Sequence, residues 1–429
     1  MDVISRALRA AAARPHVLMA TLPGGTAARL EAERLLRMWD WPPAATPAQA
    51  DLLLGVGPGR PEMQAALDRL WQDLPLPRAR VHAPRARDVE AALEAGRARL
   101  GSPSRQREQV RTSTEKGRHG SHSPHGGHGG KTREGEGGRG GHEDHGSDGG
   151  EHGGHGGPGA GETETPGGLP MAEQGEDRDG LTLDRLHVPL GPFLNDWPAG
   201  LTIRLVLQGD VIQQADLEDA RPPTGGKAVP FWVQPWLRAA AGERVSVGEA
   251  ARRRAAAHLD SLARLLSVAG WPTEAVAARR LRDDLLTGAA GSEVAARLER
   301  LARRVGRSRT LAWLTHGIGR VSAEEAREAG VSGPAARAGG DVTDRYRQWL
   351  ADIRRDVARL DDSSLLRSRA EETPRGHWKA DGPPSAALLT LLPRLLTGAE
   401  LAAARLIVAS LDPDLDELAV TRPEVTVGG

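Results

Sequence analysis

The 429-residue sequence predicts an α/β domain over residues 1–100 and a mainly α-helical domain with a small β element at its start over residues 181–429. Strand and helix patterns alternate through the first hundred residues, which is typical of a parallel sheet with crossover helices. Residues 101–180 contain few apolar residues and much Gly, His, Glu and Ser, so we expect a disordered linker. Beyond residue 245, apolar residues recur mainly at helical spacing.

In the first domain, we expect strands in the apolar runs at 15–23, 50–59 and 79–84, and helices at 26–41, 60–75 and 86–100. The first helix should end at the proline pair 42–43. This order favours a flavodoxin-like parallel sheet. The Gly-rich turn at 57–59 could suggest a phosphate loop, but the sequence lacks the Walker and dinucleotide-binding patterns.

The linker carries most of the histidines, separated largely by glycine. Imidazole side chains can bind Ni²⁺ or Zn²⁺, so the tract is a candidate weak metal site. The alternative is a solvated tether whose histidines have no specific role. The eight residues are His119, His122, His125, His128, His142, His145, His152 and His155.

The second domain should open with a β-hairpin that turns at residues 209–210. The pattern over 245–270 predicts a long amphipathic helix that ends at Gly270. Further helices are expected over 273–288, 293–316 and 344–360. Residues 385–411 should form two helices, or one that is kinked at Pro393.

Composition excludes several classes of function. The chain has no cysteine, so it cannot use thiol nucleophiles, cysteine-ligated iron–sulfur clusters or thiolate-bound nickel. Its formal net charge of zero gives no reason to expect a nucleic-acid partner. We see no signal peptide and no apolar run long enough for a membrane span. We therefore expect a cytoplasmic protein, at most peripheral to the inner face of a membrane.

Residues 46–84, "TPAQADLLLGVGPGRPEMQAALDRLWQDLPLPRARVHAP", resemble the small, iron–sulfur subunit shared by complex I and [NiFe] hydrogenases. In that family the loop after the first strand carries cluster cysteines. Here this loop reads "TLPGGTAAR", with Pro23, Gly24 and Gly25 near the ligand positions. The resemblance therefore implies the fold of the small subunit without its cluster.

The second half resembles the large, quinone-site subunit of complex I (NADH:quinone oxidoreductase), which shares its fold with the [NiFe] hydrogenase large subunit. The likeness is carried by Gly191-Pro192, by Gly209-Asp210, by "GIGRVSAEEAREAGVSGPAARAGG", by "TPRGHW" and by the final "LDPDLDE" region. It implies a fusion of both subunits and, as partners, other subunits of a complex I-like or hydrogenase-like assembly.

The chain departs from this family where the chemistry takes place. The hairpin loop lacks the family's quinone-facing histidine, and its Phe193, Asn195, Asp196 and Trp197 are the candidate quinone-pocket residues. No metal-ligating cysteine remains, so we predict neither an iron–sulfur nor a nickel–iron cofactor.

Two other positions have alternative interpretations. Asp414 and Glu417 stand where hydrogenases carry cysteines; they could bind a hard cation or form a solvated acidic cap. His258 could be a ligand, but the pattern favours a buried, hydrogen-bonded structural residue.

The first functional hypothesis is therefore a cofactor-free fusion subunit that acts as a structural or regulatory component of a redox complex. One alternative is an active quinone-binding oxidoreductase subunit that borrows clusters from its partners. Another is a His-rich accessory protein that handles nickel or zinc. Whether the chain is itself an enzyme is left open, because the catalytic residues of the resembled family are missing.

Overall fold

The structure is a computed structural model of the whole chain, and it describes residues 8, 12–119, 173–176, 182–218, 229–378 and 382–420. Met1–Glu108 and Glu173–Gly429 belong to one compact unit, and Gln109–Ala172 belong to a second. Within the first unit, we call residues 12–100 the α/β domain and residues 182–420 the helical domain.

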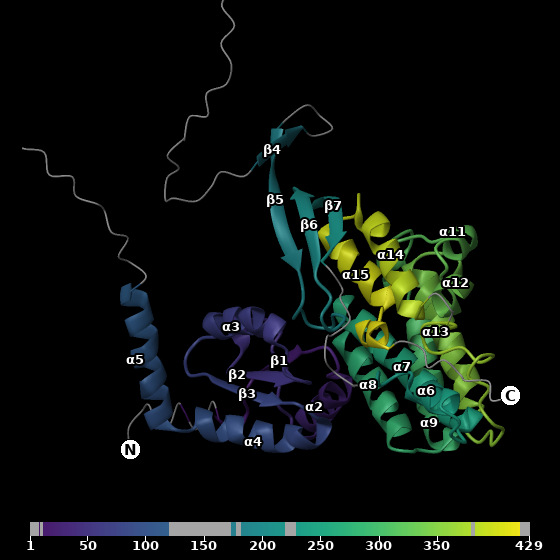
Figure 1. Cartoon of the computed structure of the whole chain (residues 1–429), viewed down its shortest axis with the longest axis horizontal. Coiled ribbons are helices and arrows are strands. Elements are labelled where there is room, and N and C mark those ends of the chain that lie inside the picture. Colours follow the sequence, from purple (N-terminus) through teal and green to yellow (C-terminus); the bar gives the residue numbers. More distant parts are fainter. Residues whose placement is uncertain are drawn as a thin grey trace, which may run out of the picture. The chain divides into compact units, whose positions relative to one another are not determined.

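The α/β domain contains the predicted parallel sheet (Figure 1). Its strands β1 (Val17–Thr21), β2 (Leu52–Val56) and β3 (Ala79–Ala83) pair in sequence order, which places β2 in the centre. A flavodoxin-like order would instead put the first strand inside the sheet, so that part of the prediction is wrong for the described strands. Every residue of β2 is buried, as a strand covered on both faces requires.

Helices cover both faces of this sheet. Figure 1 shows α2 (Thr26–Met38) and α4 (Val89–Leu100) on one side and α3 (Gln64–Asp73) on the other. Alternation along β2 divides its side chains between two apolar clusters: Leu52 and Leu54 pack in the cluster of α2 and α4, and Leu53 packs in that of α3. Phe193 of the helical domain completes the second cluster, so the two domains share part of their core.

The range 101–180, predicted to be disordered, contains two elements that the structure describes. These are α5 (Pro103–His119) and β4 (Glu173–Glu176). The remainder of the predicted linker, with seven of its eight histidines, lies outside the described residues.

The helical domain opens with the predicted β element. Strands β5 (Thr182–Leu190), β6 (Ile203–Gln208) and β7 (Val211–Leu217) form an antiparallel meander that β4 extends at one edge. Gly209, with φ of 63°, makes the predicted turn between β6 and β7. Burial alternates along β6, whose inner face packs on the helices.

Helices make up most of the rest of the domain, as predicted. Short helices over 234–240, 323–328 and 333–338 were not among those expected, and one expected helix is divided. The expected helix over 293–316 is two helices, because Ser308 accepts a hydrogen bond from the N–H of Leu311 and starts a new one. Residues 385–411 also form two helices, with Pro393 in the last turn of the first. The helices are α6 (Gln234–Ala240), α7 (Val247–Val268), α8 (Pro272–Leu286), α9 (Gly291–Gly306), α10 (Arg309–Thr315), α11 (Ala323–Glu328), α12 (Gly333–Ala338), α13 (Val342–Val357), α14 (Pro384–Leu396) and α15 (Leu401–Leu411).

The long helix α7 is confirmed, but over most of its length it has no solvent-exposed side. All residues from Arg254 to Leu266 are buried, because α8, α13 and α15 pack around it. A helix buried on all sides must satisfy each of its polar side chains within the protein. The polar side chains of α7 are therefore buried inside the molecule, where the candidate site lies.

None of the helices in the described ranges combines the length and apolar character that a membrane crossing needs.

Candidate functional site

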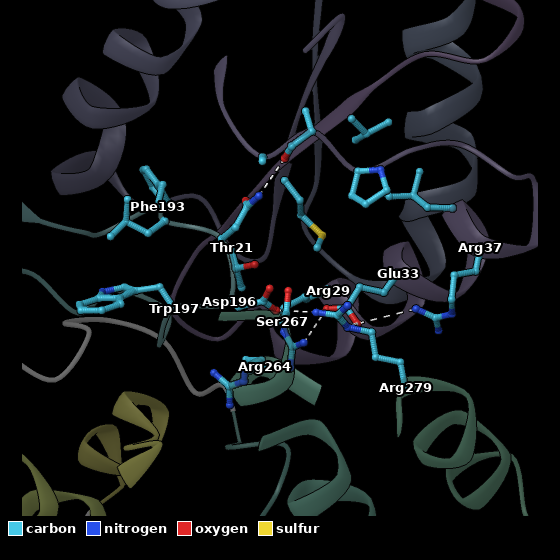
Figure 2. Close-up of a pocket in the computed structure, with 18 of the residues that line it drawn as sticks. Thr21, Arg29, Glu33, Arg37, Phe193, Asp196, Trp197, Arg264, Ser267 and Arg279 are labelled. Atoms are coloured by element: carbon cyan, nitrogen blue, oxygen red, sulfur yellow. Dashed lines mark hydrogen bonds and ion pairs between the residues drawn. The ribbon is translucent and has the colours of Figure 1, made fainter. Parts of the chain in front are cut away.

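A cavity of about 310 Å³ lies between the α/β domain and the helical domain (Figure 2). The α/β domain contributes β1, α2 and residues 41–45 to its wall. The helical domain contributes the loop 192–197 together with residues of α7 and α8. This volume is at the low end of the range found for small-molecule sites.

The chain after α2 forms one wall because it folds back along β1. Asp40 adopts a left-handed conformation with φ of 56° and reverses the chain direction. The N–H of Val17 then donates to the carbonyl of Pro42, and the N–H of Ala44 donates to the carbonyl of Val17, both at 2.9 Å. Trp41 is thereby buried beside the sheet, with its side chain on the cavity wall.

The opposite wall is the loop after β5, which contains all four predicted quinone-pocket residues. Asn195 donates from Nδ2 to the carbonyl of Ala44 at 2.9 Å, which ties the loop to the α/β domain. Trp197 donates from Nε1 to the carbonyl of Leu201 at 2.7 Å, so its polar atom is already used. Phe193 and Asp196 also line the cavity. The structure thus brings the four together on one wall, and their binding of a quinone stays a prediction.

The cavity wall is apolar over much of its extent and charged at one side. Figure 2 shows Phe193 and Trp197 at the left and the charged side chains of Glu33, Arg37 and Arg279 at the right, with Arg264 and Asp196 between them. Thr21 and Ser267 are the neutral hydroxyl groups on the wall. The apolar lining residues are Val17, Met19, Leu36, Trp41, Pro43, Ala44, Ala45, Pro192, Phe193, Leu194, Trp197 and Val276.

An ion-pair network behind the charged side joins the two domains. Arg29 of α2 reaches across to Asp260 of α7, with Nη2 at 2.7 Å from Oδ2. Glu33 of α2 accepts from Nη1 of Arg282 of α8 at 2.8 Å. Asp196 of the hairpin loop accepts from Nη2 of Arg279 at 2.5 Å.

Neighbouring arginines favour the ionised form of two carboxyl groups in this network, those of Asp260 and Glu33. Burial opposes ionisation of Asp260, but the guanidinium groups of Arg29, Arg264 and Arg282 hold its pKa well below the usual range. Glu33 behaves in the same way, since burial opposes its ionisation but Arg282, Arg29 and Arg279 hold its pKa far below the ordinary value.

The sequence patterns did not predict this network. Arg29 and Glu33 are four residues apart on one helix, a spacing normally typical of a solvated intrahelical pair. Asp260 lies on a helix whose pattern favoured one solvent-facing side. The long side chain of Arg29, only 12% exposed, shows instead that the pair is sealed between domains. The only available signal was the density of charge on α2 and α8.

The predicted solvated acidic cap at Asp414 and Glu417 is wrong. Glu417 is fully buried, and Asp416 is 6% exposed. These residues begin and form a short 3₁₀ helix, η4 (Leu415–Ala419), that packs under α14. Ser385 of α14 donates its backbone N–H to Glu417 at 3.2 Å and accepts the N–H of Asp414 on its Oγ at 2.9 Å.

The carboxyl groups of this segment resist ionisation. Burial and the neighbouring Asp414 raise the pKa of Asp416 to about 7 and that of Glu417 to about 8. Burial also raises the pKa of Asp414. Oδ2 of Asp414 and Oε1 of Glu417 are buried and receive no hydrogen bond within the described structure. Asp416 and Glu417 therefore change protonation close to neutral pH, well above the ordinary range of carboxyl groups.

Asp416 also connects the C-terminal segment to the α/β domain. Its Oδ1 accepts from the N–H of Gly24 at 2.6 Å, and its Oδ2 lies 3.4 Å from the hydroxyl of Thr26. Both donors stand at the start of α2, where a negative group is favoured. A side chain almost 400 residues away in sequence thus caps helix α2 of the other domain.

The loop at residues 22–25 does not fit an iron–sulfur cluster. It contains no side chain that could ligate iron. A Cβ on Gly25 would lie 2.5 Å from the carbonyl oxygen of Val56, so even a small side chain would clash there. With Asp416 on the N–H of Gly24, the loop is filled by protein groups.

His258 is confirmed as a buried structural residue. It is 2% exposed, and its Nε2 lies 3.0 Å from the carbonyl oxygen of Pro374. Burial lowers the pKa of its imidazole. The single tyrosine, Tyr346, is buried in the helix core, and it is not among the residues that line the cavity.

Metal binding by the histidine tract stays a prediction. His119 ends α5, and the other seven histidines lie outside the described residues. Within the ranges that the structure describes, no three histidine or carboxylate side chains converge as a metal site would require. The hard-cation interpretation of Asp414 and Glu417 has no such third ligand among those residues.

Comparison with known proteins adds little to this picture. No protein-family model matches the chain, and no curated protein sequence matches it. Among solved structures, one chain of the membrane-bound sulfane sulfur reductase (MBS), described as an archaeal respiratory membrane complex, matches with a TM-score of 0.42 and 15% sequence identity. The match covers 55% of this chain and 99% of that chain. A likeness of this level carries no argument about function.

Proposed function

We propose that this chain is a cofactor-free fusion of complex I-like or hydrogenase-like small and large subunits. It acts as a structural or regulatory component of a larger redox assembly. The observation that carries the proposal is the buried contact between the two domains: a continuous ion-pair network that connects α2 to α7 and α8. Each domain resembles one subunit, and the contact holds the two as a single body.

The buried charges between the two domains favour one specific arrangement of the domains more than they strengthen the contact. A buried ion pair contributes little net stability compared with apolar packing, yet removal of one partner costs about 3–5 kcal/mol because the other charge is stranded. The contact between Arg29 and Asp260 therefore accepts few alternative arrangements. A domain contact of this kind suits a chain retained for its shape.

The test is copurification of the tagged full-length chain from its native host, with identification of partners and measurement of iron, nickel and visible absorption. We expect partner subunits that carry iron–sulfur clusters or react with quinones, and no stoichiometric metal in the isolated chain. Stoichiometric cluster absorption from the isolated chain would contradict the proposal. So would a chain that migrates alone in native extract.

Two substitutions on the same helix connect this test to the structure. Arg29→Met removes the contact to Asp260 of the helical domain. Arg34→Met is the matched control, because Arg34 forms its ion pair with Glu31 of the same helix. We expect the first variant, and not the second, to lose its partners.

The cavity supports a second candidate function, the binding of a quinone. Its apolar wall with Phe193, Trp41 and Trp197 suits a flat, uncharged ring. A short-chain quinone analogue should raise the melting temperature by mass action. Val276→Phe, which fills the cavity from α8, should abolish that rise. No shift at saturating quinone would exclude this candidate and leave the structural role untouched.

A further inference from the structure

The ion-pair network beside the cavity contains one more cation than anions. Each member lies within 4.0 Å of an oppositely charged member among the residues that the structure describes. Asp414 also acts on Arg264 and Arg375, but burial raises the pKa of its carboxyl group and so favours its neutral form. The cations are Arg29, Arg37, Arg264, Arg279, Arg282 and Arg375, and the carboxylates are Glu33, Asp196, Asp260, Asp283 and Asp412.

This excess of positive charge cannot be removed by loss of a proton. Guanidinium groups stay protonated in proteins, and neighbouring carboxylates raise the pKa of Arg279 and Arg282 further although burial opposes this. An uncompensated buried charge is costly. The network therefore favours one additional anion close to its arginines.

Two of the arginines are positioned to receive that anion. Arg264 and Arg279 both line the cavity, and the Nε atom of each is buried without a hydrogen-bond acceptor. The closest carboxylate oxygens to these two atoms belong to Asp260 at 3.6 Å and Glu33 at 3.5 Å, beyond good hydrogen-bond length. Figure 2 shows Arg264 toward Trp197 and Arg279 toward Glu33, with Asp196 and Ser267 between them.

We propose that the cavity binds a small amphipathic monocarboxylate, with its carboxylate at Arg264 and Arg279 and its apolar body against Trp41, Phe193 and Val276. The proposal concerns the same cavity as the quinone candidate, but it assigns an acidic ligand in place of a neutral one. A carboxylate matches the planar fork of guanidinium. A monoanion neutralises a single excess charge, whereas a phosphate dianion would exceed it and leave the apolar wall uncovered.

Calorimetric titration of the full-length chain tests this with five probes: 2-naphthoate, decanoate, the neutral isostere 2-naphthamide, a short-chain quinone and inorganic phosphate. We expect one of the carboxylates to bind about ten- to a hundredfold more tightly than the amide, as charge-assisted hydrogen bonds imply. Preference for naphthoate would identify an aromatic acid, and preference for decanoate an aliphatic one. Phosphate should not bind measurably.

Three substitutions locate the binding. Arg264→Lys keeps the charge but loses the fork, and should weaken carboxylate binding about tenfold or more. Val276→Phe should abolish it without touching the ion pairs. Arg304→Lys is the matched control, because that arginine is 64% exposed and lies outside the cavity lining.

The outcomes separate this inference from the functions proposed above. Quinone binding without carboxylate binding would overturn the inference and leave the quinone candidate standing. Equal affinity for naphthoate and naphthamide would overturn it, as would carboxylate binding that survives Val276→Phe. Binding of neither quinone nor carboxylate would exclude both ligands, while the structural role is decided separately by copurification.

Discussion

Replacement of Glu417 by glutamine should remove a large part of the pH dependence of stability. Burial and the neighbouring Asp414 raise the pKa of Glu417 to about 8, from an ordinary value of 4.5. The folded protein therefore holds a proton that the unfolded chain has already lost at neutral pH. The contribution of this carboxyl group to the free energy of unfolding is fully present below its pKa in the unfolded chain. That contribution is lost as the pH rises through its pKa in the folded protein.

The size of this effect follows from the two pKa values. Between about pH 5.5 and pH 8.5, linkage predicts that Glu417 costs the wild-type chain roughly 3 kcal/mol of unfolding free energy. Glutamine has the same shape and keeps an oxygen for the N–H of Ser385, now 3.2 Å from Oε2. Glutamine at position 417 carries no charge at any pH. The difference in unfolding free energy between the variant and wild type should therefore grow by roughly 3 kcal/mol in favour of the variant from pH 5.5 to pH 8.5.

Urea unfolding of both proteins, followed by tryptophan fluorescence at the two pH values, measures this difference. Comparison with wild type at each pH cancels the contributions of groups that do not interact with Glu417, including His258, whose lowered pKa acts at the acidic end. Glu325→Gln is the control, because hydrogen bonds from Ser322 lower the pKa of that exposed carboxylate. An advantage of Glu417→Gln that is the same at both pH values would refute the reasoning.

Three further predictions concern other parts of the molecule. Asp356→Ala should cost about 3–5 kcal/mol in urea unfolding, because it strands Arg254, which donates to both of its carboxylate oxygens at 2.7 and 2.8 Å; an effect under about 1 kcal/mol would contradict this. Asp260→Asn should similarly lower the melting temperature by several degrees by weakening the contacts to Arg29 and Arg282; an unchanged melting temperature would show that the network does not hold the domains. Gly25→Ala should destabilise far more than Gly59→Ala, since a Cβ at Gly25 meets the Val56 carbonyl at 2.5 Å whereas at Gly59 the nearest atom is 3.9 Å away; equal thermal stability of the two variants would disprove the close approach.

Local patterns in the sequence predicted much of the architecture. The apolar runs around β1, β2 and β3 are short and end in Gly or Pro turns, so they identify buried parallel strands from sequence alone. The turn at Gly209 identifies the hairpin for the same reason. Strand order could not be predicted, because three βαβ-type strands allow several orders with identical local patterns.

The burial of charged residues was the property that the sequence patterns predicted least well. Asp414 and Glu417 follow the last apolar helix and are typical of a solvated end, yet α14 and the α/β domain enclose them. Arg29 and Glu33 match an exposed helical pair, yet both face the helical domain. Charge in a sequence gives no indication of burial when the partner lies more than two hundred residues away.

By itself, the sequence determined the classes of the two domains and the absence of thiol ligands, because these depend on composition and on contacts close in the chain. The four loop residues were named from a family resemblance, and only the packing of the two domains placed them on a cavity wall. Tertiary structure alone decided which face of α2 meets α7 and α8, and that Asp416 caps a helix of the other domain. It also decided that six arginines share five carboxylates beside an apolar cavity. Such properties arise from the summed field of distant side chains, which is set only when the domains pack together.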